Sequence, residues 1–298
     1  NALGDGLSHT CALLDNDQVK CWGANGYGQL GLGDTQQRGD DPGEMGDALP
    51  YVDLGTGRTA KALTVGGFHT CALLDNDKVK CWGTNGSGQL GLGDGQIRGD
   101  QAGQMGDALP YLDLGTGRSV KAISAGRGEH TCALLDNNRV KCWGDNNSGQ
   151  LGLGDNQQRG GGAGEMADAL PYVDLGTGRT AKAIASQYFS TCALLDNDRV
   201  KCWGYNGDGE LGLGDNQDRG GAPGQMGDAL PSVDLGVGRL VKAVTAHGLH
   251  TCAVLDNDYV KCWGDNFNGA LGLGDTVDRG NAPGHMCDAL PYVKLLGP

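Results

Sequence analysis

The chain has 298 residues, of which 56 are glycine, with 5% aromatic residues and a formal net charge of −13. So much glycine, without a three-residue period and with apolar residues throughout, excludes collagen and disorder and indicates short strands joined by tight turns. The excess of 36 carboxylates over 23 lysines and arginines disfavours a nucleic-acid partner or an anionic membrane surface. No apolar run is long enough for membrane insertion, and the start at Asn1 is interpreted as a processed N-terminus.

The predicted elements recur with a period of about sixty residues. The segment HTCALLDNDQVKCWGANGYGQLGLGD, residues 9–34, returns almost unchanged at residues 69–94 and again from His130, Ser190 and His250. No linker separates the copies, so we predict a single domain over residues 1–298, with repeats that begin near residues 1, 61, 121, 182 and 242.

Four strands are predicted in each copy. In the first copy TCALLDN and VKCWG flank an Asx turn at residues 15–17, which favours a hairpin. After a long loop, LPYVDLG at residues 49–55 and AKALTVG at residues 60–66 flank the turn Gly-Thr-Gly-Arg and predict a second hairpin. Four strands per period are typical of a propeller blade, so the fold class is an all-β propeller of five four-stranded blades.

The two ends of the chain lie at the same point of the repeat. Residues 1–3 align with residues 61–63, and residues 293–298 align with residues 233–238. This phase favours a closed ring, because closure removes exposed sheet edges. An open or spiral solenoid is the structural alternative.

The motif HTCALLDNxxVKCWGxNxxGQLGLGD closely resembles the repeat of the regulator of chromosome condensation family, which includes alpha-tubulin suppressor-like proteins. The resemblance covers every copy and implies a propeller. It implies no single function, because the family includes a nucleotide exchange factor, a plant ultraviolet photoreceptor, ubiquitin-ligase accessory domains and a secreted bacterial inhibitor of β-lactamase. Members usually carry seven blades, whereas this chain has five. The cysteine pairs and the loop around GEMGDALP also depart from intracellular members.

Ten of the eleven cysteines form five Cys-x9-Cys pairs, each centred on the turn of the first hairpin. Folding each hairpin about its turn places the two cysteines opposite each other, within reach of a disulfide. Five metal sites are the alternative, but two thiolates supply only half of a zinc site. We therefore predict disulfides and a secreted or cell-surface protein. The predicted pairs are Cys11 with Cys21, Cys71 with Cys81, Cys132 with Cys142, Cys192 with Cys202, and Cys252 with Cys262.

Cys287 is the cysteine left over. An unpaired cysteine in a secreted chain suggests an intermolecular thiol, and a buried free thiol or neutral drift is the alternative interpretation.

The recurrent histidines and tryptophans are both interpreted as structural residues. The histidines His9, His69, His130 and His250 lack a recurrent nucleophile beside them, and Ser190 breaks the series, so we predict imidazoles that bond loop carbonyls. The tryptophans at 22, 82, 143, 203 and 263 are predicted to pack between blades, with the indole N–H bonded to backbone.

The recurrent Arg-Gly is interpreted as a salt bridge. Arg38-Gly39-Asp40 resembles an integrin-binding tripeptide, but later copies lose the Asp, so the arginine is expected to pair with a loop carboxylate. The predicted pairs are Arg38 with Asp34, Arg98 with Asp94, Arg159 with Asp155, Arg219 with Asp215, and Arg279 with Asp275.

Two further patterns concern metal binding and glycosylation. Clusters such as Asp15-Asn16-Asp17 could hold calcium, but they lack the spacing of an EF-hand loop and are explained by Asx turns. Asn85 and Asn146 head glycosylation sequons, which in a eukaryotic secreted protein would place their loop at the surface. No cofactor or metal is predicted.

The copies vary at three places: the loop before His-Thr, the residues after Trp-Gly, and the Arg-Gly loop. Variable loops on an invariant frame predict a binding module for protein or glycan, with Gln187, Tyr188 and Phe189 as the candidate interface. Phe189 could instead fill space left by the missing imidazole. A structural subunit of an extracellular filament, coat or matrix, made of copies of the chain, is the alternative function. An enzyme is not expected, because no copy introduces a nucleophile, base or metal cluster.

Overall fold

A computed structural model describes residues 2–295 in two compact units. The first unit comprises residues 1–137, 141–145 and 158–171, and the second comprises residues 138–140, 146–157 and 172–298. Asn1 and residues 296–298, which entered the alignment of the chain ends, lie outside the described residues. Closure of the ring therefore stays a prediction.

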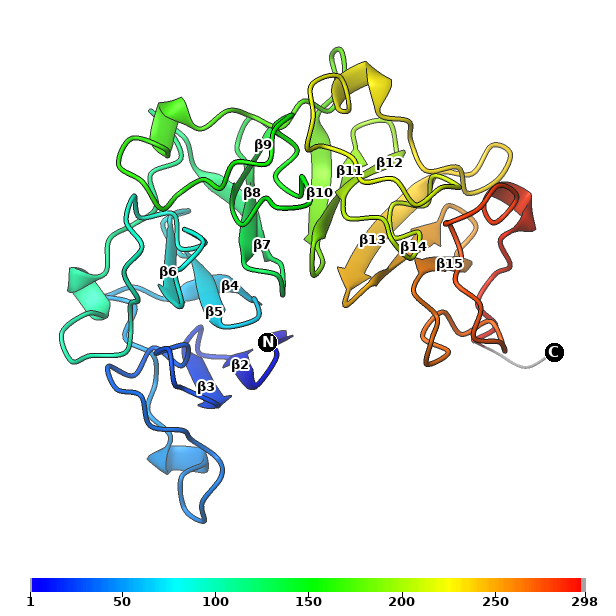
Figure 1. Cartoon of the computed structure of the whole chain (residues 1–298). Helices are drawn as coiled ribbons and strands as arrows, with labels where there is room; N and C mark the ends of the chain where they lie inside the picture. Colours follow the sequence, from blue (N-terminus) through cyan, green and yellow to red (C-terminus); the bar gives the residue numbers. More distant parts are fainter. Residues whose placement is uncertain (1, 296–298) are drawn as a thin grey trace. The chain divides into compact units, whose positions relative to one another are not determined.

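Each repeat contributes one three-stranded antiparallel sheet (Figure 1). The middle strand carries HTCALL and the outer strand carries VKCWG, and the inner strand comes from the segment that precedes them in the chain. The strands of the first three repeats are β1 (Ala2–Asp5), β2 (His9–Leu13), β3 (Val19–Gly23), β4 (Ala60–Val65), β5 (His69–Leu74), β6 (Val79–Gly83), β7 (Val120–Ala125), β8 (His130–Leu135) and β9 (Val140–Gly144). Those of the last two are β10 (Ala181–Ser186), β11 (Ser190–Leu195), β12 (Val200–Gly204), β13 (Val241–His247), β14 (His250–Leu255) and β15 (Val260–Gly264).

The predicted first hairpin is confirmed. In the first copy the register pairs Cys11 with Cys21 across β2 and β3. The turn between them places Asp17 at φ 59°, and Asn16 accepts a hydrogen bond from the backbone N–H of Gln18 through Oδ1 at 3.2 Å. This is the Asx geometry that the Asp-Asn-Asp sequence favours, so local turn chemistry sets the register.

The predicted second hairpin is wrong, and each sheet has three strands instead of four. The segment at residues 49–55 forms no strand, because Pro50 has no N–H to donate and the segment makes a single backbone bond to β3, from Val52 to the carbonyl of Val19 at 2.9 Å. Leu49, Val52 and Leu54 are buried in the core. Their apolar alternation therefore reflects burial of a loop against the sheet, not a ladder.

The segment at residues 60–66 does form a strand, but its partner is the sequence that follows it. β4 pairs antiparallel with β5. In each repeat the outer strand ends in an isolated bridge to the Arg-Gly loop, such as the one between Gly23 and Arg38. The long loop of each repeat also contains one 3-10 turn: η1 (Gly46–Ala48), η2 (Gly106–Ala108), η3 (Ala167–Ala169), η4 (Gly227–Ala229) and η5 (Cys287–Ala289).

The core of each unit lies between consecutive sheets. In the first unit, Trp82 and Leu109 join Leu13 and Leu30 of the preceding repeat in one apolar cluster. In the second unit, Trp263 and Leu290 join Leu194 and Leu211 in the same way. Repeats thus bury their apolar faces against their neighbours, as the tandem sequence predicts. Over residues 2–295, no helix has the length and apolar character needed to cross a membrane.

Candidate functional site

One backbone carbonyl joins each repeat to the next. The indole N–H of Trp82 donates to the carbonyl of Gln29 at 3.0 Å, and Oγ1 of Thr70 donates to the same oxygen at 3.0 Å. Trp143 and Thr131 bond the carbonyl of Gln89 in this way. Trp203 and Thr191 use Gln150, and Trp263 and Thr251 use Glu210. These four tryptophans are fully buried, so their predicted packing between repeats and backbone bonding are confirmed.

The histidines extend this junction, but their partner is a hydroxyl and not the carbonyl that the sequence suggested. Nε2 of His9 lies 2.9 Å from Oγ1 of Thr70, and Nε2 of His69 lies 3.0 Å from Oγ1 of Thr131. Because each threonine gives its proton to the carbonyl, the imidazole must donate from Nε2 and is held as the neutral tautomer. Burial lowers the pKa of His9 to about 4 and that of His69 to about 3.

Gln187 replaces the missing imidazole in the fourth repeat. Its Nε2 donates to Oγ1 of Thr251, and its Oε1 accepts the hydroxyl proton of Ser190 at 2.7 Å. In the second repeat the residue equivalent to Gln187 is Gly66, where an added Cβ would lie 2.2 Å from Cε1 of His69. A side chain at Gly66 would therefore clash with the buried imidazole of His69, whereas the fifth repeat has His247 at this position beside the half-buried His250. Gln187 is 2% exposed, so it belongs to the junction and not to an exposed interface.

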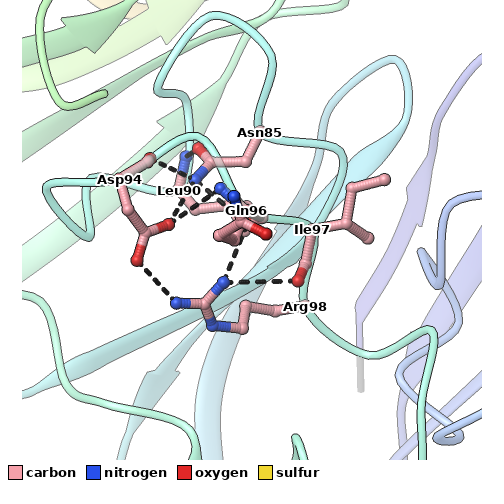
Figure 2. A network of polar contacts seen from close by, with 6 residues as sticks. All are labelled: Asn85, Leu90, Asp94, Gln96, Ile97 and Arg98. Carbon is pink, nitrogen blue, oxygen red and sulfur yellow. Dashed lines mark hydrogen bonds and ion pairs between the residues drawn. The ribbon is translucent and has the colours of Figure 1, made fainter. Parts of the chain in front are cut away.

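The asparagine of each Trp-Gly-x-Asn motif organises the following loop, as Figure 2 shows for the second repeat. Nδ2 of Asn85 donates to the carbonyl of Asp94 at 2.6 Å, and its Oδ1 accepts from the N–H of Leu90 at 3.0 Å. Asn146 makes the equivalent bonds to Asp155 and Leu151. Both asparagines are fully buried. The predicted sequon loops reach the surface at Gly86 and Asn147, but the nitrogen that would carry a glycan is used inside the loop. Use of the sequons stays a prediction.

The predicted arginine pairs are confirmed in four repeats. Nη2 of Arg98 lies 2.7 Å from Oδ2 of Asp94, and Nη1 donates to the carbonyls of Gln96 and Ile97 (Figure 2). The same 2.7 Å pair joins Arg38 to Asp34, Arg219 to Asp215, and Arg279 to Asp275. The pair of Arg159 with Asp155 stays a prediction. Because the guanidinium of Arg38 is held by its own loop, the integrin-like tripeptide is explained as loop structure.

A buried lysine in the last four hairpins was missed by sequence reasoning. Nζ of Lys80 donates to the carbonyls of Leu54 and Gly106 at 3.1 and 2.7 Å, and it lies 4.7 Å from the ring centre of Tyr111. Burial lowers the pKa of Lys80. Lys141, Lys201 and Lys261 repeat the two carbonyl bonds. The Val-Lys-Cys-Trp sequence of each repeat indicated this burial. Side chains two residues apart in a strand point to the same face, so the lysine shares its face with the tryptophan.

The structure brings all five predicted cysteine pairs to bonding distance, with Sγ–Sγ separations of 2.04–2.09 Å. Cys287 is free and half-buried. It begins η5 at φ 61°, where three of the other repeats have glycine. No group of three metal-binding side chains was found within residues 2–295, and Asx turns account for the Asp-Asn clusters.

In the first, second, fourth and fifth repeats, each of which has these loops in a single unit, the three variable loops meet at one edge. The carbonyl just before the His-Thr strand accepts the N–H that follows Trp-Gly, as between Phe68 and Thr84 at 3.0 Å and between Phe189 and Tyr205 at 2.9 Å. The Arg-Gly loop reaches the same edge through its bridge to the end of the outer strand, as between Gly83 and Arg98 and between Gly204 and Arg219. We call this edge of a repeat its variable rim. In the first unit it comprises residues 8 and 68 and the loops 24–28, 84–88, 36–41 and 96–101, and in the second it comprises residues 189 and 249 and the loops 205–209, 265–269, 217–222 and 277–282.

Aromatic side chains are exposed on the rim of both units. In the first unit, Tyr27 is 46% exposed and packs edge-on against Phe68 at 5.5 Å. In the second unit, Phe189 is 37% exposed and lies 6.4 Å from Tyr205, while Phe267 is 77% exposed. Variable exposed aromatics on a rigid frame are suited to binding.

The rim of the second unit is also acidic. Burial, together with the nearby Asp278 and Asp265, raises the pKa of Asp208. Burial and the carboxylates of Asp208, Glu210 and Asp218 raise the pKa of Tyr205. Carboxylates that raise one another's pKa produce a negative field, which attracts cationic groups at short range.

Known proteins share this sequence and fold. The chain is 29% identical over 280 residues to the ultraviolet-B receptor UVR8 of Arabidopsis thaliana. The aligned region covers 93% of this chain and 55% of the receptor. It is 30% identical over 217 residues to the probable ubiquitin ligase HERC4 of Mus musculus, covering 72% of this chain and 18% of the ligase. The chain thus spans about half or less of these curated relatives.

Solved structures show the same fold at lower identity. Prp20p of Saccharomyces cerevisiae, studied for its binding to Gsp1p and histones, superimposes with a TM-score of 0.69 at 20% identity, covering 98% of this chain and 63% of that protein. Human WBSCR16 superimposes with a TM-score of 0.68 at 20% identity, and the match covers 95% of this chain and 68% of WBSCR16. The family model for the regulator of chromosome condensation (RCC1) repeat matches residues 6–29, 60–89, 120–150, 182–210 and 241–270. Because each match coincides with one sheet, the five repeats of this chain belong to the RCC1 repeat family.

Proposed function

We propose that this chain is an extracellular, non-enzymatic binding module that recognises a protein partner through its variable rim. The observation that carries the proposal is that the three variable loops of a repeat converge on a frame whose recurrent polar side chains are already bonded internally. These loops expose Tyr27 in the first unit, and Phe189 and Phe267 in the second. Aromatic residues dominate the binding energy of protein interfaces, and loops tolerate the variation that specificity requires. The five cysteine pairs at bonding distance support an oxidising compartment.

Partner capture with matched variants tests this function. The chain, the rim variant Phe189→Ser with Phe267→Ser, and the control Tyr259→Ser would be presented as equal amounts of folded protein to extracellular extract and to a glycan array. Tyr259 is 56% exposed but belongs to a hairpin turn outside the rim. We expect one protein to be lost by the rim variant and kept by the control. Equal capture by all three proteins would reject the rim, and binding confined to the array would assign a glycan ligand.

A structural role is the second candidate, and Cys287 is the observation that favours it. Its thiol is free and half-buried, so a modest movement of η5 would expose it to a second copy. Sedimentation of the chain and of Cys287→Ser without reductant distinguishes the two functions. A disulfide-linked assembly that disappears in the variant supports an architectural subunit.

We further propose that the five repeats close into one ring. Trp22 is only half-buried while its four equivalents are fully buried, and Ala270, at the position of Gln29, is exposed. The first repeat thus carries the donor half of a junction and the last repeat the acceptor half. Closure predicts that Trp22→Ala destabilises the whole chain as much as Trp82→Ala, by about 3–5 kcal/mol. A linear array predicts a much smaller effect at Trp22.

A further inference from the structure

Glu210 stands where three other repeats have glutamine. The side-chain oxygen of Gln29 accepts the N–H of Tyr27 at 2.9 Å, and Gln89 and Gln150 accept from Ser87 and Ser148 at the same distance. Oε2 of Glu210 accepts the N–H of Asp208 at 3.0 Å in the same manner. The carboxyl therefore occupies the place and orientation of the amide, and Oε1 takes the place of the amide nitrogen.

The backbone carbonyl of Glu210 also accepts the hydrogen bonds that join the fourth repeat to the fifth. Its carbonyl accepts the indole N–H of Trp263 at 2.9 Å and the hydroxyl of Thr251 at 3.2 Å. The residue is 1% exposed, and its buried Oε1 has no hydrogen-bond partner among the described residues. The unpartnered carboxyl oxygen and the carbonyl that holds the next repeat thus belong to one buried residue.

The groups around this carboxyl are acidic. Asp208 and Asp218 face it from its own repeat, beside the phenol of Tyr205. Asp265 and Asp278 of the fifth repeat act on Asp208. Burial, reinforced by Asp208 and Asp218, raises the pKa of Glu210 to about 7, although backbone N–H groups oppose this shift. The protonated carboxyl is a neutral counterpart of the glutamine at the other junctions, whereas the ionised one is a buried charge surrounded by like charges.

We propose that the junction between the fourth and fifth repeats is a proton-controlled joint, closed when Glu210 is protonated and loosened when it is ionised. An ionised carboxylate gains hydration by drawing Oε1 toward water, which pulls its carbonyl from Trp263 and Thr251. The first three junctions that the structure describes carry glutamine, so this response is local to one joint.

The raised pKa of Glu210 determines how the stability of this junction changes with pH. The pKa of Glu210 is raised from 4.5 in the open chain to about 7 in the closed joint. The joint therefore has its full stability below about pH 4.5, weakens as the pH rises toward 7, and reaches a plateau above that value. A shift of this size corresponds to an increase in the opening equilibrium on the order of 10²-fold.

Exchange of the indole hydrogens with solvent measures this opening directly. With ¹⁵N-labelled tryptophan, the ratio of the Trp263 and Trp203 exchange rates cancels the intrinsic pH dependence, because Trp203 bonds the neutral Gln150 in the same unit. Between pH 5 and pH 8 the ratio is expected to rise on the order of 10²-fold in the wild-type chain. Glu210→Gln should hold the ratio constant. Gln150→Glu should transfer the pH response to Trp203.

Three results would overturn the proposal. One is a wild-type ratio that stays constant with pH, and a second is a ratio that still rises in Glu210→Gln. The third is a loss of protection at both tryptophans together, which would show global and not local opening. Because glutamine is native at the equivalent position of three repeats, Glu210→Gln is expected to fold, and circular dichroism verifies this.

Discussion

The side-chain amide of Gln187 donates to the hydroxyl of Thr251, the contact that an imidazole makes in the first two junctions. The sequence change from Gly and His to Gln and Ser is thus one coupled replacement. Ser190→His alone should clash with Gln187 and lower the unfolding free energy by about 1–3 kcal/mol. Gln187→Gly alone should leave Thr251 without its donor. The double variant should recover most of the loss, because it restores the pair found at Gly66 and His69.

Urea denaturation of the four proteins measures this coupling. Additive losses in the double variant would show that the two positions do not exclude each other, contrary to the geometry at His69.

The buried histidines predict a stability that falls in acid. Burial lowers the pKa of His9 to about 4 and those of His69 and His130 to about 3, from 6.5 in the unfolded chain. Their contribution is complete above about pH 6.5 and is lost as the pH falls, because the unfolded chain takes up the protons first. At the acid limit, protonation lowers the unfolding free energy by roughly 3 kcal/mol for His9 and by roughly 5 kcal/mol for His69 or His130.

Urea midpoints between pH 7 and pH 4 check this, with His69→Asn as the test variant. Its stability relative to wild type should improve as the pH falls. A difference that is independent of pH would mean that His69 titrates normally.

Glycosylation is expected to be absent from the folded chain at Asn85 and Asn146. Their side-chain nitrogens are bonded inside the loop, so a glycan requires the loop to open. Asn85→Ala should cost about 2 kcal/mol, since it leaves the N–H of Leu90 and the carbonyl of Asp94 unpaired. Mass spectrometry of material secreted from a eukaryotic host tests occupancy. A modified Asn85 in correctly folded protein would contradict the buried network.

The five hairpin disulfides should each add roughly 2–3 kcal/mol, because each closes a loop of ten residues. Non-reducing peptide mapping should recover every pair within its own repeat. Replacing Cys132 and Cys142 together by serine should lower the melting temperature, whereas reduction of that variant should have a smaller additional effect than reduction of the wild type. Links between repeats, or free thiols at these ten positions, would refute the pairing.

The sequence was sufficient for features that depend on neighbouring residues. The Asx turn at Asn16 sets the register of the hairpin, and the register then places Cys11 opposite Cys21. The sequence was insufficient where buried loop residues alternate with polar ones as they would in a β-strand. Val52 and Leu54 alternate like a strand because they pack into the core, and no ladder partner is present for them. Equally, no local signal distinguishes a sequon asparagine at the surface from Asn85, whose partners lie up to eleven residues further along the chain.

The Trp-to-carbonyl bond has a consequence for how the chain reaches its fold. The donor and acceptor are separated by 53 or 54 residues at each of the four described junctions. Loop-closure entropy depends on this separation, so it is nearly the same for every junction and favours no starting point. Differences in side chains then decide the order in which repeats dock. At neutral pH the contact between Glu210 and Trp263 should form last, which leaves the fifth repeat as the segment longest exposed to proteases and chaperones during folding.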